Sequence, residues 1–237
     1  MILPFEKNFF KEHGYDVDFE GHPLLDEIEN HKHNIISRDR FLEINRLPDM
    51  PIVALLPGSR MQEINHVLPV MLDIRKHYPG FSFVIAGAPS IDLQAYQRIT
   101  GTSDVKIIYD QTYSLIQFAT AALVTSGTAT LETALLGTPE VVCYKTGRFT
   151  IFIARLLIHV RFISLVNLIS GKEVVKELLQ NELNSMRIKE ELDKVLFDSD
   201  VRETMIKNYA NLYLQLGGSG ASRRIAEKIF SLLNQKN

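Results

Sequence analysis

Between Pro51 and Lys145, short apolar runs alternate with segments of helical period, and this alternation constrains the fold more than any other feature. Near-continuous apolar strands joined by helical connections are typical of a parallel sheet that is buried on both faces. The sequence therefore predicts an α/β fold, a doubly wound Rossmann-like sheet with helices on both faces, over residues 51–237. The runs that predict strands are "IVALLPG", "FSFVIAGAP", "VKIIYD", "AALVTSG" and "PEVVCYK".

Outside these runs the pattern predicts mainly helices. The N-terminal "ILPFE" predicts the end of a strand, and the residues after it a short helix, a strand and a turn. Residues 27–49 are polar and predict a linker with one short helix, whereas "FISLVNLISG" (162–171) predicts a strand or an extended loop. Helical spacing of apolar residues predicts helices over 61–72, 112–119, 128–136, 148–160, 186–196, 201–216 and 222–233.

Composition excludes several classes of protein. The formal net charge of −2, without a basic run, argues against a nucleic-acid partner. The single cysteine, Cys143, lies in an apolar strand and is expected in the core of a protein from a reducing cytoplasm. No leader peptide is expected, and Arg155, His159 and Arg161 interrupt the most apolar region, so no spanning helix is predicted.

The first candidate loop is "LLPGSRMQE", where an apolar strand leads into a helix. Gly58 permits a tight turn, and the amides of Gly58 and Ser59 open the next helix, whose N-terminus favours an anion. Arg60 adds a planar cation suited to phosphate oxygens. The alternative is a loop arginine that pairs with Glu63.

The second candidate loop is "VTSGTATLETALLGTP", in which another strand leads into a helix. Ser126, Gly127 and Thr128 are small enough for their amides to approach a phosphate, and Glu132, one turn later, can accept hydrogen bonds from sugar hydroxyls. The alternative is that Ser126 or Thr128 caps the helix and Glu132 complements its dipole.

The remaining candidates carry less information. Asn167 is polar within an apolar run, so it either satisfies backbone groups or reaches a ligand. His31 and His33 lack a nearby third ligand, so no metal site is expected. The absence of GxGxxG and of a Walker lysine argues against a dinucleotide oxidoreductase.

The predicted helix over 148–160 has a basic stripe and a bulky apolar stripe. Such a helix either lies on an anionic membrane surface or covers a sheet. The candidate membrane contacts are Arg148, Phe149, Phe152, Arg155 and Arg161.

Seven motifs in one order give the chain a strong resemblance to the C-terminal part of the lipid-A-disaccharide synthase family. They are "ILPFE", "GHPLLD", "LLPGSRMQEI", "TSGTATLETALLGTP", "VVCYK", "SLVNLISGKEVVKELLQNE" and "GGSGASRRIAEKI". The resemblance implies a two-domain GT-B glycosyltransferase without a metal or organic cofactor. It would transfer 2,3-diacylglucosamine from UDP-2,3-diacylglucosamine to 2,3-diacylglucosamine 1-phosphate in lipopolysaccharide biosynthesis, in the cytoplasm at the surface of the inner membrane.

The same resemblance implies roles for individual residues. Arg60 and Asn167 match residues that are important for activity in the family, and Glu132 matches the ribose-binding acid of GT-B enzymes. The expected UDP site is Gly58, Ser59, Arg60, Ser126, Gly127, Thr128 and Glu132.

The chain departs from the family pattern at its start, because the "GE.SGD" motif and the candidate aspartate base are not in it. We therefore expect residues 1–26 to be a remnant of the acceptor-side domain, 27–50 a linker and 51–237 the UDP-sugar-binding domain. On its own such a chain would bind UDP without transferring the sugar, and a homodimer is compatible with the sequence. The alternatives are another GT-B enzyme that uses UDP-N-acetylglucosamine, such as a peptidoglycan glycosyltransferase or a 2-epimerase, and a non-catalytic nucleotide- or membrane-binding module.

Overall fold

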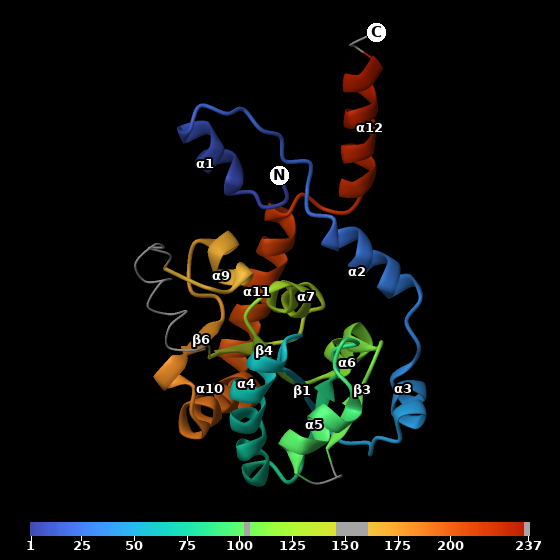
Figure 1. Cartoon of the computed structure of the whole chain (residues 1–237), viewed down its shortest axis with the longest axis vertical. Helices are drawn as coiled ribbons and strands as arrows, with labels where there is room; N and C mark the ends of the chain where they lie inside the picture. Colours follow the sequence, from blue (N-terminus) through green and yellow to red (C-terminus); the bar gives the residue numbers. More distant parts are fainter. Residues whose placement is uncertain (102–104, 146–160, 235–237) are drawn as a thin grey trace.

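The computed structural model describes residues 1–101, 105–145 and 161–234 (Figure 1). Six strands form one sheet in the order β3-β2-β1-β4-β5-β6, and every neighbouring pair is parallel. This confirms the predicted α/β Rossmann-like fold. The strands are β1 (Ile52–Leu56), β2 (Ser82–Ala86), β3 (Lys106–Ile108), β4 (Ala121–Thr125), β5 (Glu140–Tyr144) and β6 (Lys176–Leu179).

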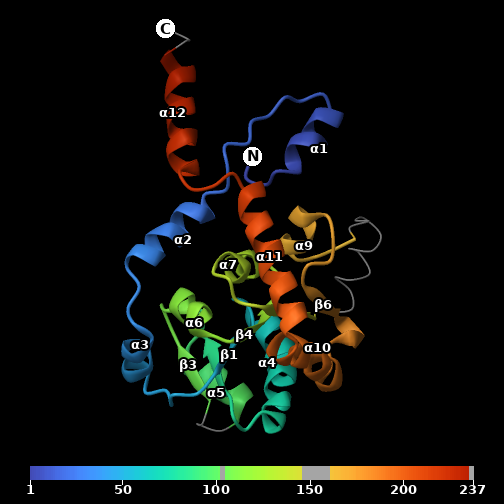
Figure 2. The same cartoon turned by 180° about the vertical axis from the view of Figure 1, so that it is seen from behind.

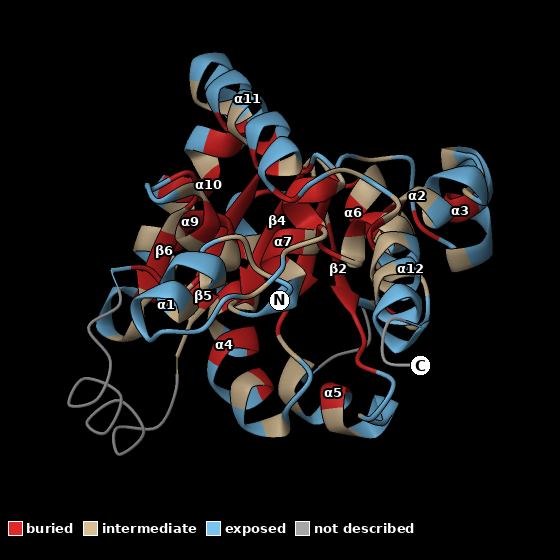
Figure 3. Ribbon diagram, turned by 90° about the horizontal axis from the view of Figure 1, so that it is seen from above, coloured by how far each residue is buried: buried red, intermediate tan, exposed pale blue. Residues whose placement is uncertain are grey.

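Helices surround the sheet, with the buried residues gathered on the strands and on the inner faces of the helices (Figure 3). Those before β3 are α1 (Glu6–Glu12), α2 (Leu24–His33), α3 (Arg38–Asn45), α4 (Met61–Asp73), the 3-10 helix η1 (Ile74–His77) and α5 (Leu93–Thr100). Those after β3 are α6 (Thr112–Phe118), α7 (Thr128–Leu135), α9 (Leu165–Ser170), the 3-10 helix η2 (Gln180–Glu182), α10 (Ser185–Phe197), α11 (Ser199–Gln215) and α12 (Ala221–Asn234).

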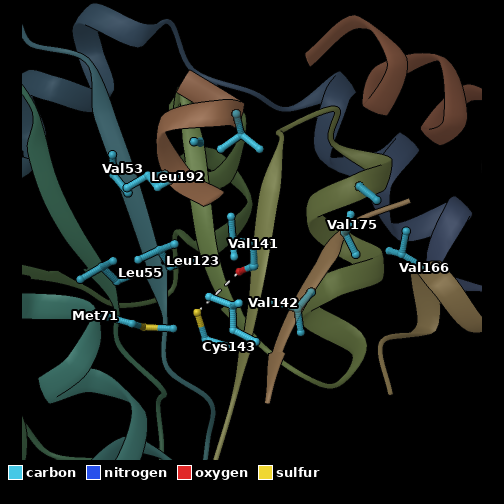
Figure 4. Packing of buried hydrophobic residues seen from close by; sticks show 14 of the residues in the cluster. Val53, Leu55, Met71, Leu123, Val141, Val142, Cys143, Val166, Val175 and Leu192 are labelled. Atoms are coloured by element: carbon cyan, nitrogen blue, oxygen red, sulfur yellow. Dashed lines mark hydrogen bonds between the residues drawn. The ribbon is translucent and has the colours of Figure 1, made fainter. Parts of the chain in front are cut away.

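Both faces of the sheet are buried, which is why the residues of its central strands β1, β2 and β4 are almost all apolar. In β1, Val53 and Leu55 join one core with residues of α4 and α10, whereas the alternate residues join a second core with residues of α3 and α6. Figure 4 shows part of the first core, in which Cys143 is fully buried as predicted. Burial raises the pKa of its thiol and makes it a poor nucleophile.

The strand order has one consequence for function. From β1 the chain runs outward to β2 and β3, then returns to the other side of β1 and continues outward through β4, β5 and β6. The connections that follow β1 and β4 therefore leave in opposite directions, and ligands of such sheets bind in the crevice at this switch point.

The N-terminal part differs from the sequence prediction. Leu3 to Phe5 form a turn into α1 instead of a strand, because the Glu6 carboxylate accepts hydrogen bonds from the amides of Ile2 (3.0 Å) and Leu3 (2.9 Å) and so caps the chain before the helix. Residues 27–50 hold most of α2 and all of α3 instead of one short helix. Phe41 of α3 is fully buried in the second core, against one face of the sheet.

A second difference concerns residues 162–179. The predicted strand or extended loop over 162–171 is wrong, because Ser164 caps α9 by accepting from the amide of Asn167. Strand β6 was not predicted, since Lys176 and Glu177 interrupt its apolar pattern. The helices near 186–196, 201–216 and 222–233 are confirmed, whereas the helix predicted over 148–160 lies outside the described residues.

Two elements extend beyond the sheet at one end of the molecule. Helices α1 and α12 project from the end where the N-terminus lies (Figures 1 and 2). On α12 the exposed large apolar side chains are Ile229, Phe230, Leu232 and Leu233. Among the described residues, no helix has both the length and the apolar character needed to cross a membrane.

Two buried glutamates have opposite surroundings. Glu140 at the start of β5 is fully buried, and neither carboxylate oxygen has a hydrogen-bond partner among the described residues. Burial therefore raises its pKa well above the ordinary value of 4.5. Glu177 of β6 is almost as buried, but its carboxylate accepts from the amides of Ile163 and Ser164, the Ser164 hydroxyl and the Asn167 side chain.

We expect Glu140→Met to raise the free energy of unfolding by about 1–3 kcal/mol at pH 8, because it removes an unpaired buried carboxyl group. With a folded-state pKa above the unfolded one, the wild-type protein loses stability as pH rises above about 4.5. The advantage of the variant should therefore grow with pH in urea unfolding.

Glu177→Gln is the matched control, and it should lower stability, since its amide group would face the N–H of Ile163 in place of an oxygen. If Glu140→Met left the free energy of unfolding unchanged or lowered it, the conclusion that the unpaired Glu140 carboxyl destabilises the fold would be wrong.

Candidate functional site

A pocket of about 410 Å³ lies beyond the carboxyl ends of β1, β2 and β4, at the switch point of the sheet. It brings together all seven residues of the predicted phosphate and sugar site. Asn167, the eighth candidate, is not among its lining residues. The pocket is lined by Leu56, Gly58, Ser59, Arg60, Glu63, Ala86, Gly87, Ala88, Pro89, Thr112, Thr125, Ser126, Gly127, Thr128, Ala129 and Glu132.

The loop after β1 places a glycine and an arginine at the pocket. Gly58 has φ +99°, and a Cβ there would lie 2.6 Å from Oε2 of Glu63, so glycine meets both the conformation and the close approach. Arg60 precedes α4, and its Nη1 donates to Oε1 of Glu63 at 3.2 Å. The arginine side chain is 81% exposed, so this pair is weak and leaves the guanidinium free to turn toward an anion.

The loop after β4 supplies hydroxyl groups and a helix N-terminus. Gly127, with φ +149°, is the residue before α7, which begins at Thr128 at the pocket. The Ser126 hydroxyl donates to the Ile163 carbonyl at 2.9 Å, which fixes the side chain against the segment before α9. Thr125 is 2% exposed, and its hydroxyl has no hydrogen-bond partner among the described residues.

Glu132 of α7 lies on the pocket wall, partly buried. Its Oε1 accepts a hydrogen bond from the Tyr113 hydroxyl at 3.3 Å. Burial raises the pKa of the Glu132 carboxyl, and the Tyr113 hydrogen bond opposes that rise by stabilising the carboxylate. The pocket thus combines one exposed cation, two helix N-termini and two carboxylates, of which Glu63 is paired with Arg60 and Glu132 is not. Together these groups suit a ligand with an anionic part and a hydroxyl-bearing part.

The loop after β2 was missed as part of the site. A Cβ on Gly87 would lie 2.6 Å from the Tyr109 ring, so only glycine allows these loops to pack so closely. The amide of Ala88 donates to the Tyr96 hydroxyl at 2.9 Å, which holds the loop in place. The "GAP" stretch at the end of a strand was the available sequence signal, as it matches the other two loops in position.

Asn167 of α9 is fully buried, and both the oxygen and the nitrogen of its side-chain amide are hydrogen-bonded to residues between α9 and the end of β6. Its Nδ2 donates to the Val175 carbonyl and to Oε1 of Glu177, both at 2.8 Å. Its Oδ1 accepts from the amides of Val174 (2.7 Å) and Val175 (3.0 Å). Glu177 continues the network through the Ile163 amide, and the Ile163 carbonyl accepts from Ser126, so Asn167 connects to the pocket through two intermediates.

Most of the candidate membrane residues cannot be placed. Arg148, Phe149, Phe152 and Arg155 lie outside the described residues. Arg161 is exposed, and its guanidinium lies 5.1 Å from the centroid of the Phe162 ring. In the described parts of the chain, no three His, Cys, Asp or Glu side chains are grouped as a metal ion would require.

Comparisons with known proteins agree with the motifs. The model of the family LpxB, lipid-A-disaccharide synthetase, matches residues 1–229. The lipid-A-disaccharide synthase of Myxococcus xanthus is 37% identical over 238 residues, 98% of this chain and 61% of that protein. The enzyme of the same name from Syntrophus aciditrophicus is 38% identical over 245 residues, 100% of this chain and 63% of that protein.

Solved structures with the same fold are more distant in sequence. A UDP-N-acetylglucosamine 2-epimerase matches with a TM-score of 0.60 at 16% identity, over 99% of this chain and 57% of that chain. The UDP-GlcNAc 2-epimerase from Neisseria meningitidis, bound to UDP-GlcNAc, matches with a TM-score of 0.58 at 20% identity, over 95% and 58%. At such identities the likeness shows the fold alone.

The chain spans somewhat less than two thirds of the length of the curated relatives it matches. The family match nevertheless covers nearly all of its own residues and all three loops that line the pocket. The chain belongs to the lipid-A-disaccharide synthetase family.

Proposed function

We propose that this chain is the donor-binding half of a lipid-A-disaccharide synthase and that the pocket at the switch point binds the UDP part of UDP-2,3-diacylglucosamine. The observation that carries the proposal is the meeting of Arg60, the N-terminus of α7 and Glu132 in one pocket. In this arrangement the diphosphate faces Gly58, Ser59, Arg60, Ser126, Gly127 and Thr128, and the ribose hydroxyls face Glu132. Family membership favours this function over a 2-epimerase or a peptidoglycan glycosyltransferase.

The proposed reaction is an inverting displacement. The 6-hydroxyl oxygen of 2,3-diacylglucosamine 1-phosphate forms a bond to the anomeric carbon while the bond from that carbon to UDP breaks. The hydroxyl proton passes to a general base, and the leaving UDP gains negative charge. Without a metal, this charge is stabilised by the Arg60 guanidinium and by the amides at the starts of α4 and α7.

The acceptor site and the general base belong, in this proposal, to the acceptor-side domain, of which residues 1–26 are a part, with 27–50 as the connection. The acyl chains of both substrates favour work at the cytoplasmic surface of the inner membrane, where the basic and apolar residues near 148–161 would make contact. A homodimer is part of the proposal, and the exposed apolar residues of α12 support a partner there.

We propose that Asn167 contributes to activity, and that it does so indirectly. Its side chain and Glu177 hold the segment before α9, which in turn accepts the hydrogen bond of Ser126 at the pocket. The alternative role, direct contact with the substrate, would require Asn167 to give up one of four buried hydrogen bonds.

Arg60→Ala should weaken the binding of UDP about 10- to 100-fold in isothermal titration calorimetry, because charge-assisted hydrogen bonds to phosphate are lost. Arg40→Ala is the matched control, since Arg40 forms the same kind of exposed pair three residues from its partner, Glu43. UDP affinity within twofold of the wild type in Arg60→Ala would remove Arg60 from the site.

Asn167→Asp should lower the free energy of unfolding by about 2–4 kcal/mol in urea, because an oxygen would face the Val175 carbonyl and the Glu177 carboxylate. Asn208→Asp is the control, since Asn208 accepts a hydrogen bond from Lys172 that an aspartate keeps. Wild-type stability in Asn167→Asp would instead favour direct contact with a ligand.

Assayed alone, the 237 residues should bind UDP without forming a disaccharide from UDP-2,3-diacylglucosamine and 2,3-diacylglucosamine 1-phosphate. Product detection by mass spectrometry checks this, with the Myxococcus xanthus relative as the positive control. Disaccharide formation by the chain alone would show that it holds the acceptor site and base. Failure to bind UDP would reject the donor-binding function.

A further inference from the structure

Tyr113 lies between the pocket and the segment that precedes the sheet. Helices α2 and α6 both contact α7, the helix that carries Glu132. Tyr113 of α6 donates its hydroxyl to Glu132, and its ring meets the ring of His31 from α2 edge to face, with centroids 5.4 Å apart. Tyr113 of α6 therefore contacts two other helices, α2 through the His31 ring and α7 through the Glu132 carboxylate.

The hydrogen bond from Tyr113 makes the two oxygens of the Glu132 carboxylate inequivalent. Oε1 receives the Tyr113 hydroxyl, whereas Oε2 has no hydrogen-bond partner among the described residues. Rotation of the carboxylate would lose the bond to Tyr113, so the contact favours one orientation of the two oxygens. A ligand with hydroxyl groups in the pocket would meet an acceptor that is already oriented.

Space filling alone does not account for the hydroxyl of Tyr113, since a phenylalanine would pack against His31 equally well. Burial and the neighbouring carboxylate raise the pKa of the phenol above its ordinary value, so the group stays a hydrogen-bond donor at neutral pH. Neither His31 nor Tyr113 belongs to the motif of Glu132 in the sequence, since α2, α6 and α7 are separate elements.

We propose that Tyr113 is a positioning residue that orients Glu132 toward the vicinal hydroxyls of ribose, so that the site prefers ribonucleotides to 2′-deoxyribonucleotides. The proposal rests on the proposed UDP-binding function and adds a residue and a specificity to it. His31 supports Tyr113 through the edge-to-face contact between their rings.

The test compares the affinities for UDP and for 2′-deoxy-UDP by titration calorimetry. The wild-type chain should bind UDP more tightly than 2′-deoxy-UDP. Tyr113→Phe should weaken UDP about fivefold, the size of one hydrogen bond, and leave 2′-deoxy-UDP almost unchanged. Tyr109→Phe is the matched control, because the Tyr109 hydroxyl donates to the Ile91 carbonyl and not to Glu132, and it should leave the ratio of affinities as in the wild type.

A second comparison combines Tyr113→Phe with Glu132→Gln. Glu132→Gln alone should already reduce the preference for UDP over 2′-deoxy-UDP, and adding Tyr113→Phe should then change the UDP affinity less than twofold. Equal weakening of both nucleotides by Tyr113→Phe, or no weakening, would overturn the positioning role while UDP binding by the wild type leaves the proposed function intact. A wild-type chain that binds neither nucleotide would instead overturn the proposed function itself and this inference with it. Thermal unfolding of each variant checks that the fold is retained.

Discussion

Burial of the parallel sheet on both faces determines where polar groups can lie in this protein. Strands covered by helices on both sides are mainly apolar, so polar groups that act on a ligand gather in the loops at the strand ends. The strand order then selects which loops can act together, because β1 and β4 are neighbours whose connections leave in opposite directions. The pocket with Arg60 and Glu132 follows from this topology.

The side chains that line the pocket do not carry a net positive charge, although the ligand proposed for it is an anion. Arg60 is the cation that lines it, and Glu63 and Glu132 are both acids on its wall. Arg60 is paired with Glu63 only at the surface, where such a pair contributes little. The binding of a diphosphate would therefore depend as much on backbone amides at the starts of α4 and α7 as on side-chain charge, and Glu132 would serve the uncharged part of the ligand.

A buried polar network is connected to the pocket through the hydrogen bond between Ser126 and Ile163. The carboxylate of Glu177 accepts four hydrogen bonds and Asn167 makes four through its side chain, so the segment before α9 is held by groups that cannot move singly without leaving a buried polar atom unpaired. Glu140 shows the contrast, since its carboxyl is buried without hydrogen-bond partners among the described residues and burial raises its pKa. Position within the same sheet does not distinguish these acids; their hydrogen bonds do.

The fold class, five of the six strands and the seven residues that meet in the pocket could all be predicted from the sequence, because apolar runs and turn residues are local signals. Strand β6 and helix α9 could not be predicted. A charged residue such as Glu177 argues against a buried strand unless hydrogen-bond donors surround it, and those donors come from other segments. Ser164 caps α9 only once the loop is folded. Tertiary structure alone decided that Asn167 faces the protein interior and that Tyr113, His31 and Glu132 meet. Contacts between separate helices depend on how those helices pack on the sheet, and no spacing within the chain encodes that directly.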